Sequence, residues 1–113
     1  MCSQYVLSEI TGRVVKAAKD SLGNKLDKVI LYGSYARGDY DDESDIDIMV
    51  LADIPRESRG TERERIRSII GWLELEYNVV LSLKVTDCMT FYTFLEEIPF
   101  YLNVLKEGVE LSA

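Results

Sequence analysis

Two apolar segments joined by a short polar connection constrain the fold of this chain more than any other feature. Residues 28–32 are rich in β-forming side chains and end at the pair Gly33-Ser34. Ten residues after that pair, the segment 45–51 (DIDIMVL) opens with two aspartates and continues as an apolar run. Because only a short connection separates the two segments, we predict two neighbouring strands. A helical turn over 34–37 and an acidic loop over 39–43 would lie between them.

Asp45 and Asp47 stand two positions apart on the second predicted strand. Side chains alternate between the faces of a strand, so both carboxylates project from the same face. At a separation of roughly 5 Å and an effective dielectric constant of about 20, two such charges repel by about 3 kcal/mol, which favours a bound counter-ion. Hard divalent cations such as Mg²⁺ or Mn²⁺ take oxygen ligands, commonly carboxylates together with phosphate oxygens. The pair therefore predicts a metal-ion site, whereas the alternative is an ordinary polar strand edge.

The turn before these carboxylates has the character of an anion-binding site. Gly33 and Ser34 lie at a strand end, where a following helical turn would aim backbone N–H groups at an anion. Arg37 adds a positive charge beside them. Gly33 also suits an ordinary turn, Ser34 an ordinary helix cap, and Arg37 a surface pair with Asp39 or Asp41. Capping and anion binding use the same N–H groups, so we predict that this turn contacts phosphate.

Composition excludes several kinds of chemistry. The chain of 113 residues contains no histidine, which removes the commonest general base, Ser-His and Cys-His nucleophile pairs, and histidine zinc sites. A formal net charge of −7 makes direct nucleic-acid binding unfavourable and suits a basic protein partner better. The length predicts a single domain over residues 1–113. No apolar segment indicates a signal peptide or a membrane span, so we expect a cytoplasmic protein.

Helical periodicity and capping residues predict two further helices around the strand pair. Apolar residues recur at helical spacing over 3–22, and the helix would end near Gly23. A second amphipathic helix would begin at Thr61, because Thr61 and Glu64 match a capping box. The intervening residues 54–60 are expected to form a polar break.

The C-terminal part predicts a third strand and two short helices. Residues 78–85 would form a buried strand, and Thr86 or Asp87 would cap the next helix. Pro99 would begin the last helix and Gly108 would end it. The order α-β-β-α-β-α predicts an α/β fold, a small mixed β-sheet with helices on one face that leaves the other face for a ligand.

The motif Gly-Ser, ten residues, Asp-x-Asp resembles the signature of nucleotidyltransferases of the DNA polymerase β superfamily. In this chain it reads GSYARGDYDDESDID over residues 33–47, which is similar to the minimal (MNT-type) branch. Residues 100–109, FYLNVLKEGV, resemble the tail of that branch, so the similarity covers nearly the whole chain. Many members of the branch resemble the antitoxin of a toxin–antitoxin pair, whose partner is an all-helical HEPN-type ribonuclease.

The resemblance implies a polymerase β-like nucleotidyltransferase fold and a set of site residues. Asp45 and Asp47 would be the catalytic and metal-binding carboxylates, for Mg²⁺ or Mn²⁺. Gly33, Ser34 and Arg37 would bind ATP or another nucleoside triphosphate. The implied reaction moves a nucleoside monophosphate, AMP in the case of ATP, to a hydroxyl group, plausibly a tyrosine of the partner toxin. Apolar and aromatic residues near the C-terminus also make a homo-oligomer an option.

One departure from the family pattern leaves an alternative open. Active members carry a third carboxylate on the next strand, where it helps to hold a second ion and accepts a proton, whereas residues 78–85 contain no acid. Sequence fit places Val80 at that position, with Asn78 and Ser82 as the polar residues of the same face, and Lys84 is expected to reach solvent. The alternative is a catalytically weakened, nucleotide-binding antitoxin that acts by protein–protein occlusion. A modifier of small-molecule alcohols would need a separate subunit for its acceptor.

Overall fold

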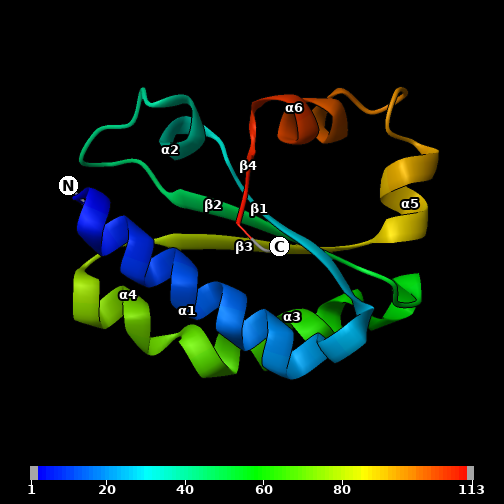
Figure 1. Cartoon of the computed structure of the whole chain (residues 1–113), viewed down its shortest axis with the longest axis horizontal. Coiled ribbons are helices and arrows are strands. Elements are labelled where there is room, and N and C mark those ends of the chain that lie inside the picture. The colour runs from blue at the N-terminus through cyan, green and yellow to red at the C-terminus, as the bar shows by residue number, and fades with distance from the viewer. Residues whose placement is uncertain (1–2, 112–113) are drawn as a thin grey trace.

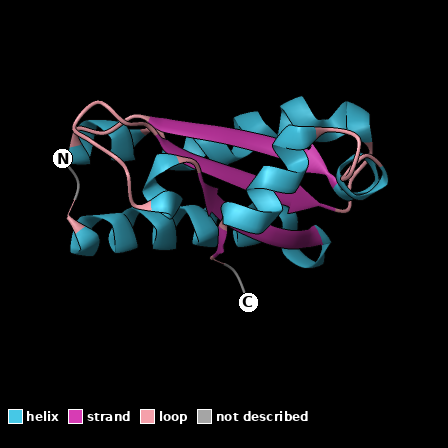
Figure 2. Ribbon diagram, turned by 90° about the horizontal axis from the view of Figure 1, so that it is seen from above, coloured by secondary structure: helices cyan, strands magenta, loops and turns pink. Residues whose placement is uncertain are grey.

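The computed structural model describes residues 3–111, in which a four-stranded sheet lies between two layers of helices (Figure 1). The strands follow the order β3-β2-β1-β4. β1 (Leu26–Tyr32) and β2 (Ile46–Ala52) are antiparallel neighbours, β3 (Leu81–Asp87) is parallel to β2, and β4 (Val109–Glu110) is antiparallel to β1. The long strands run side by side through the molecule (Figure 2). The predicted α/β class with a small mixed sheet is confirmed, and so is the pairing of the first two strands.

Helices cover both faces of this sheet. α1 (Gln4–Leu22), α3 (Arg59–Ile70) and α4 (Trp72–Tyr77) lie on one face, and α5 (Cys88–Thr93) and α6 (Pro99–Glu107) lie on the other (Figure 1). α2 (Ser34–Arg37) is a single turn after β1, and the 3-10 turns η1 (Gly23–Lys25) and η2 (Arg56–Ser58) precede β1 and α3. Within residues 3–111, no helix has the length and apolar character needed to cross a membrane.

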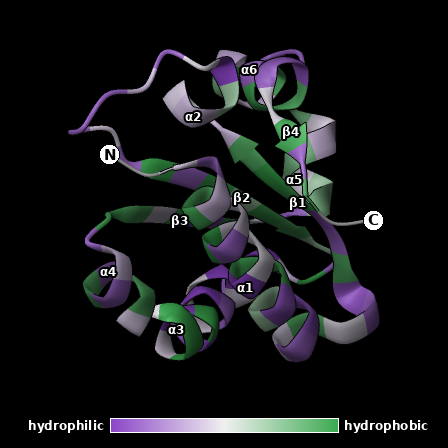
Figure 3. Cartoon of the chain, turned by 60° about the vertical axis from the view of Figure 1, so that its left-hand side comes forward, coloured by the Kyte–Doolittle hydropathy of each residue, from purple (hydrophilic) through white to green (hydrophobic). Residues whose placement is uncertain are grey.

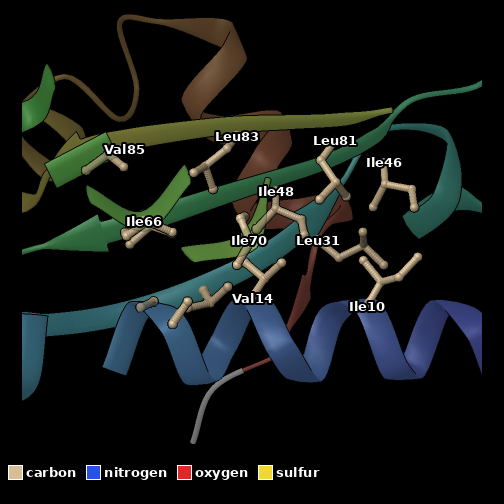
Figure 4. Packing of buried hydrophobic residues seen from close by; sticks show 14 of the residues in the cluster. Ile10, Val14, Leu31, Ile46, Ile48, Ile66, Ile70, Leu81, Leu83 and Val85 are labelled. Atoms are coloured by element: carbon tan, nitrogen blue, oxygen red, sulfur yellow. The ribbon is translucent and has the colours of Figure 1, made fainter. Parts of the chain in front are cut away.

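Two apolar clusters explain why both faces are covered. The main core joins α1 and α3 to the sheet, through buried residues that include Ile10, Val14, Ile66, Ile70, Leu31, Ile48, Leu81 and Leu83 (Figure 4). A smaller cluster on the opposite face joins Met49 and Leu51 of β2 to Phe91 of α5 and Val104 of α6. The expectation of helices on one face alone is corrected by this cluster, because its apolar side chains need cover from water. Only part of the second face is left for a ligand.

Two predicted helix starts and one predicted helix end agree with the structure, and α1 has a cap that was not predicted. The Ser3 side chain accepts a hydrogen bond from the backbone of Val6 and caps α1. Asp87, one of the two residues predicted to cap the next helix, caps α5. Pro99 is the first residue of α6, and Gly108 follows its last residue. These positions are local in origin, because a cap needs only the few N–H or C=O groups that a helix end leaves unpaired.

Two predicted boundaries are wrong. Thr61 is not a helix cap, because α3 already begins at Arg59, whose guanidinium pairs with the buried Asp87. The third strand begins at Leu81 and not at Asn78, because Asn78 adopts a left-handed conformation with φ of 54° that ends α4. β4 has no counterpart among the predicted elements, since a strand of two residues carries no periodic pattern.

Candidate active site

The two motif aspartates lie on the sheet face that α6 partly covers. Ile46 is fully buried in the main core, so the alternation along β2 turns its neighbours Asp45 and Asp47 to the opposite face. In the strand register, Asp47 stands between Tyr32 of β1 and Ser82 of β3. The structure thus brings together the predicted carboxylate pair and a polar side chain from the third strand.

Asp47 is held in an unfavourable electrostatic environment. Burial raises the pKa of Asp47, and the neighbouring Asp45 carboxylate raises it further. A hydrogen bond from Ser82 and the positive charges of Lys84 and Arg37 lower it, but the pKa remains above the ordinary value for an aspartate. A divalent cation between the two carboxylates would relieve this repulsion, because an opposite charge favours the ionised form.

The donor atoms present fit a single hard cation. Among residues 3–111, no group of three or more His, Cys, Asp and Glu side chains could hold a metal ion, so Asp45 and Asp47 stand as a pair. The Ser82 hydroxyl beside Asp47 adds a neutral oxygen. Two carboxylates and one hydroxyl leave positions for water and phosphate oxygens, which is the usual environment of Mg²⁺ in nucleotide sites. The residues therefore fit one Mg²⁺ or Mn²⁺ ion shared with a phosphate chain.

Gly33 holds the first half of the motif against the second. Its φ of +74° lies in the region that favours glycine, and a Cβ atom on Gly33 would collide with Oδ2 of Asp47. The Gly33 carbonyl accepts hydrogen bonds from the backbone N–H groups of Ala36 and Arg37, both at 3.1 Å, which closes α2. The glycine-serine turn and the carboxylate strand are therefore in direct contact.

Ser34 and Arg37 lie on α2 beside this contact. Ser34 is partly buried, and Arg37 is exposed. The Arg37 guanidinium contacts Asp39 (Nε to Oδ2, 3.2 Å) and Glu107 of α6 (Nη1 to Oε1, 3.5 Å). Its charge nevertheless reaches Asp47 and lowers the pKa of that residue. The surface pair with Asp39 is thus present, and Arg37 also acts electrostatically on the carboxylate pair.

Ser82, and not Val80, occupies the position of the third strand next to Asp47. Asp47 pairs with Ser82 in the parallel register of β2 and β3, whereas Val80 precedes the strand and is 54% exposed. The expected position of Val80 is therefore wrong, because sequence fit does not determine the register of a parallel pair. A signal was available: Ser82 lies between the apolar residues Leu81 and Leu83, as a polar residue on a half-covered strand should. The conclusion that no carboxylate stands there is unchanged.

Two further side chains belong to the same face. Lys84 is exposed, as expected, but its Nζ atom lies 6.0 Å from the centroid of the Phe100 ring, and its charge lowers the pKa of Asp47. Tyr32 is 8% exposed, and its hydroxyl has no hydrogen-bond partner among the residues that the structure describes. Burial and the Asp47 charge raise the pKa of Tyr32 to about 12, so the phenol stays protonated at neutral pH. Tyr32 was predicted as part of a strand but not as a site residue, because its apolar neighbours indicate only a core strand.

Two hollows flank this face and meet at Phe100 of α6, which lines both. One of them, with a volume of about 320 Å³, is lined by Gly33 and Arg37. The other, with a volume of about 480 Å³, lies over β3 and is lined by Ser82 and Lys84. Both are in the size range of small-ligand sites. A reaction between two substrates could therefore place one substrate on each side of Phe100.

The fold and the site together define a class of protein. A glycine-serine turn and an Asp-x-Asp strand lie in contact on neighbouring antiparallel strands, with a parallel third strand beside them, as in nucleotidyltransferases. The nucleotidyltransferase domain family matches residues 12–108 of the chain, and the protein belongs to this family.

Relatives from Methanocaldococcus jannaschii are similar over most of their length. "Putative protein adenylyltransferase MJ0141" is 36% identical over 93 residues, which cover 82% of this chain and 92% of the relative. MJ0604, which has the same description, is 36% identical over 94 residues, which cover 83% of this chain and 86% of the relative. The similarity thus extends over the domain and is not confined to the motif.

Solved structures share the fold at lower identity. A Sulfolobus solfataricus protein assigned to the nucleotidyltransferases superposes with a TM-score of 0.57 at 22% identity, over 91% of this chain and 77% of that one. A toxin–antitoxin structure with AMP-PNP superposes with a TM-score of 0.52 at 24% identity, over 88% of this chain and 70% of that one. A structure of the toxin–antitoxin MntA-HpeT gives 0.53 at 21% identity, with the same coverage. At these identities the likeness establishes the fold alone.

Proposed function

We propose that this protein transfers AMP from ATP to a hydroxyl group of a partner protein and depends on Mg²⁺ or Mn²⁺. The contact between Gly33 and Asp47 carries the proposal, because it joins a carboxylate pair to a turn that can hold phosphates. The names of MJ0141 and MJ0604 support an adenylyl group and a protein acceptor.

Each site residue has a distinct role in this proposal. Asp45 and Asp47, with the Ser82 hydroxyl, would hold the ion, which when bound offsets negative charge on the phosphate chain. The backbone N–H groups that follow Gly33 and the Arg37 guanidinium would orient the phosphates of ATP. Gly33 itself keeps the space beside Asp47 free of a side chain.

The transfer replaces one phosphorus–oxygen bond by another. The acceptor oxygen attacks the α-phosphorus, the bond from that phosphorus to the bridging oxygen breaks, and pyrophosphate leaves with the bonding electrons. The hydroxyl proton passes to water, because Ser82 stands where a carboxylate could otherwise accept it. General base catalysis contributes about 10²- to 10⁴-fold in rate, so we expect the transfer to be slow.

The proposed acceptor is a tyrosine of a HEPN-type helical toxin, and the protein would then act as an antitoxin. The fold is shared with proteins in toxin–antitoxin structures, one of them with AMP-PNP. Exposed apolar side chains such as Trp72 (47% exposed), Leu75 (89%) and Met89 (80%) offer surface for such a partner. The same side chains could instead support a homo-oligomer.

A second candidate function is neutralisation of the partner by occlusion alone. The observation that favours it is Ser82, a hydroxyl where a third carboxylate would complete a two-ion site. In that case the protein would bind nucleotide for stability and cover its partner without modifying it.

A transfer assay distinguishes the two candidates. The purified protein is incubated with the product of its neighbouring gene, Mg²⁺ and ATP labelled at the α-phosphate. We expect label on the partner, and at least a hundredfold less label with the variant Asp45→Asn/Asp47→Asn. The variant Asp20→Asn/Asp53→Asn, which makes the same charge change at exposed positions outside the site, should behave as the wild type. A stable complex without label would contradict transfer and support occlusion.

A further inference from the structure

The hollow over β3 is positively charged in a protein whose net charge is −7. Arg59 and Arg63 of α3 and Lys84 of β3 line it, and no carboxylate is among its described lining residues. Asp87 at the end of β3 has a side chain that is 3% exposed, and it pairs with Arg59 at 2.6 Å. Arg59 is therefore neutralised, and the charge that faces a ligand comes from Arg63 and Lys84.

A hydrogen bond to the edge strand β3 orients the Arg63 side chain. Its Nε donates a hydrogen bond to the Leu83 carbonyl at 2.9 Å, and Arg67 donates to the Leu81 carbonyl at 3.3 Å. These bonds cover the outer edge of β3, which is the edge strand of the sheet. Arg63 also forms a surface pair with the exposed Glu64 at 3.5 Å, which is weak. The guanidinium is thus ordered at the rim of the hollow and still able to pair with an anion.

The hollow over β3 lies next to the Asp45 and Asp47 carboxylates. Ser82 lines the hollow over β3 and is also the register partner of Asp47. Phe100 lies between the hollow over β3 and the hollow at Gly33, and it lines both. In the proposed function, the phosphates of ATP occupy the Gly33 side. The side over β3 then remains for the second substrate, whose hydroxyl would approach over Ser82.

We propose that this hollow binds the acceptor segment, and that the segment carries carboxylate side chains next to the hydroxyl that it presents. The inference rests on the proposed transfer function. Arg63 and Lys84 would form charge-assisted hydrogen bonds with aspartate or glutamate, and the rings of Phe100 and Tyr101 would pack on a tyrosine side chain. The acceptor segment is therefore acidic, although the net charge of the whole protein favours a basic partner. A polyanion such as RNA fits less well, because the rest of the surface repels it.

Peptide binding tests this site without requiring transfer. Two fluorescent peptides, each with one tyrosine flanked by four glutamates or by four lysines, are titrated with the full chain in Mg²⁺ and α,β-methylene-ATP, and anisotropy is recorded. We expect the acidic peptide to bind about tenfold more tightly or better, and Arg63→Gln and Lys84→Gln each to weaken it by about threefold to tenfold. Arg65→Gln is the matched control, because Arg65 lies on the same helix, pairs with Glu62 and is not part of the hollow. Thermal melting confirms that each variant is folded.

Three results would overturn the inference. These are equal or weaker binding of the acidic peptide, an equal loss with Arg65→Gln, and tighter binding of a single-stranded RNA of the same charge that Arg63→Gln also weakens. Calorimetry with α,β-methylene-ATP separates the two substrates, since Arg63→Gln should leave the nucleotide affinity unchanged. If the acidic peptide binds as expected but no label from ATP reaches any acceptor, the site for acidic segments stands and the proposed transfer function fails.

Discussion

Individual residues of the site destabilise the folded protein. Asp45 raises the pKa of Asp47, whose burial already raises it, so the folded chain holds two carboxylates where the charge is costly. Any other residue at position 33 would be strained, because the backbone φ there is +74° and a Cβ atom would collide with Asp47. Such a combination is typical of a position that serves binding and not folding.

The substitution Gly33→Ala should remove nucleotide binding. The new Cβ collides with Asp47 Oδ2 and the positive φ adds strain, so we expect at least a tenfold loss of affinity for Mg-ATP and a loss of about 1–3 kcal/mol in the free energy of unfolding. Calorimetry and urea unfolding measure the two effects. Gly38→Ala is the control, because Gly38 also has a positive φ (+87°) but a Cβ there meets no atom within 4 Å. Equal nucleotide affinity in both variants would contradict the assigned role of Gly33.

Among the elements, the junction between β3 and α5 shows how one carboxylate can organise three segments. Asp87 ends β3, caps α5 through a hydrogen bond from the Thr90 backbone at 2.9 Å, and pairs with Arg59 at the start of α3. Its burial raises the pKa, but the hydrogen bonds from Thr90 and the Arg59 guanidinium together bring the pKa below the ordinary value. The junction also fixes one wall of the hollow over β3, since Arg59 lines that hollow.

The substitution Asp87→Ala should destabilise the fold strongly. It removes a helix cap and leaves Arg59 without its buried partner, so we expect the free energy of unfolding to fall by about 3 kcal/mol or more. Urea unfolding at neutral pH measures this change, with Asp53→Ala at an exposed position as the control.

The same substitution should also change the response to pH. A carboxylate with a lowered folded pKa contributes stability that is fully present above the ordinary aspartate pKa and is lost as pH falls through the folded value. The difference between wild type and Asp87→Ala should therefore shrink in acid below about pH 4. A difference that stays constant into strong acid would show that the ionised carboxylate contributes little.

For the whole molecule, net charge and local charge differ. The loop between α2 and β2 is largely hydrophilic (Figure 3) and contains five acidic side chains, Asp39, Asp41, Asp42, Glu43 and Asp45. The hollow over β3 is lined by cations instead. A single value of −7 therefore describes neither region, and the field at each site decides which ligand it attracts.

Ligand binding should stabilise the whole chain through mass action. At about one hundred times its dissociation constant, Mg-ATP adds roughly 2.7 kcal/mol to the stability of a one-site protein, which corresponds to a rise in Tm of roughly 10 °C or more for a domain of about 100 residues. The variant Asp45→Asn/Asp47→Asn should show no such rise, and its Tm without metal should equal or exceed that of the wild type because the repulsion is gone. Scanning fluorimetry with and without EDTA checks both points. A full rise of Tm in the variant would exclude the aspartates as the nucleotide-binding metal ligands.

The sequence by itself determined the features that depend on neighbours along the chain. The period-two alternation at Asp45 and Asp47, the glycine at the end of β1, the cap at Asp87 and the helix start at Pro99 are all readable over a few residues. Their physical causes, which are pleating, backbone sterics and unpaired N–H groups, act over the same short range. The adjacency of the two halves of the motif followed as well, since a short connection leaves antiparallel pairing as the simple solution.

Only the tertiary structure decided which residues surround the Gly33-Ser34 turn and the Asp45 and Asp47 carboxylates. The register that sets Ser82 beside Asp47, the helix that brings Phe100 between two hollows, and the cationic wall with Arg63 all join segments distant in the sequence. Such contacts are selected by the packing of the whole domain, since the second apolar cluster has to be covered by α5 and α6 and these helices then shape the remaining face. No local pattern encodes that choice, because each segment is compatible with several neighbours until the complete core is assembled.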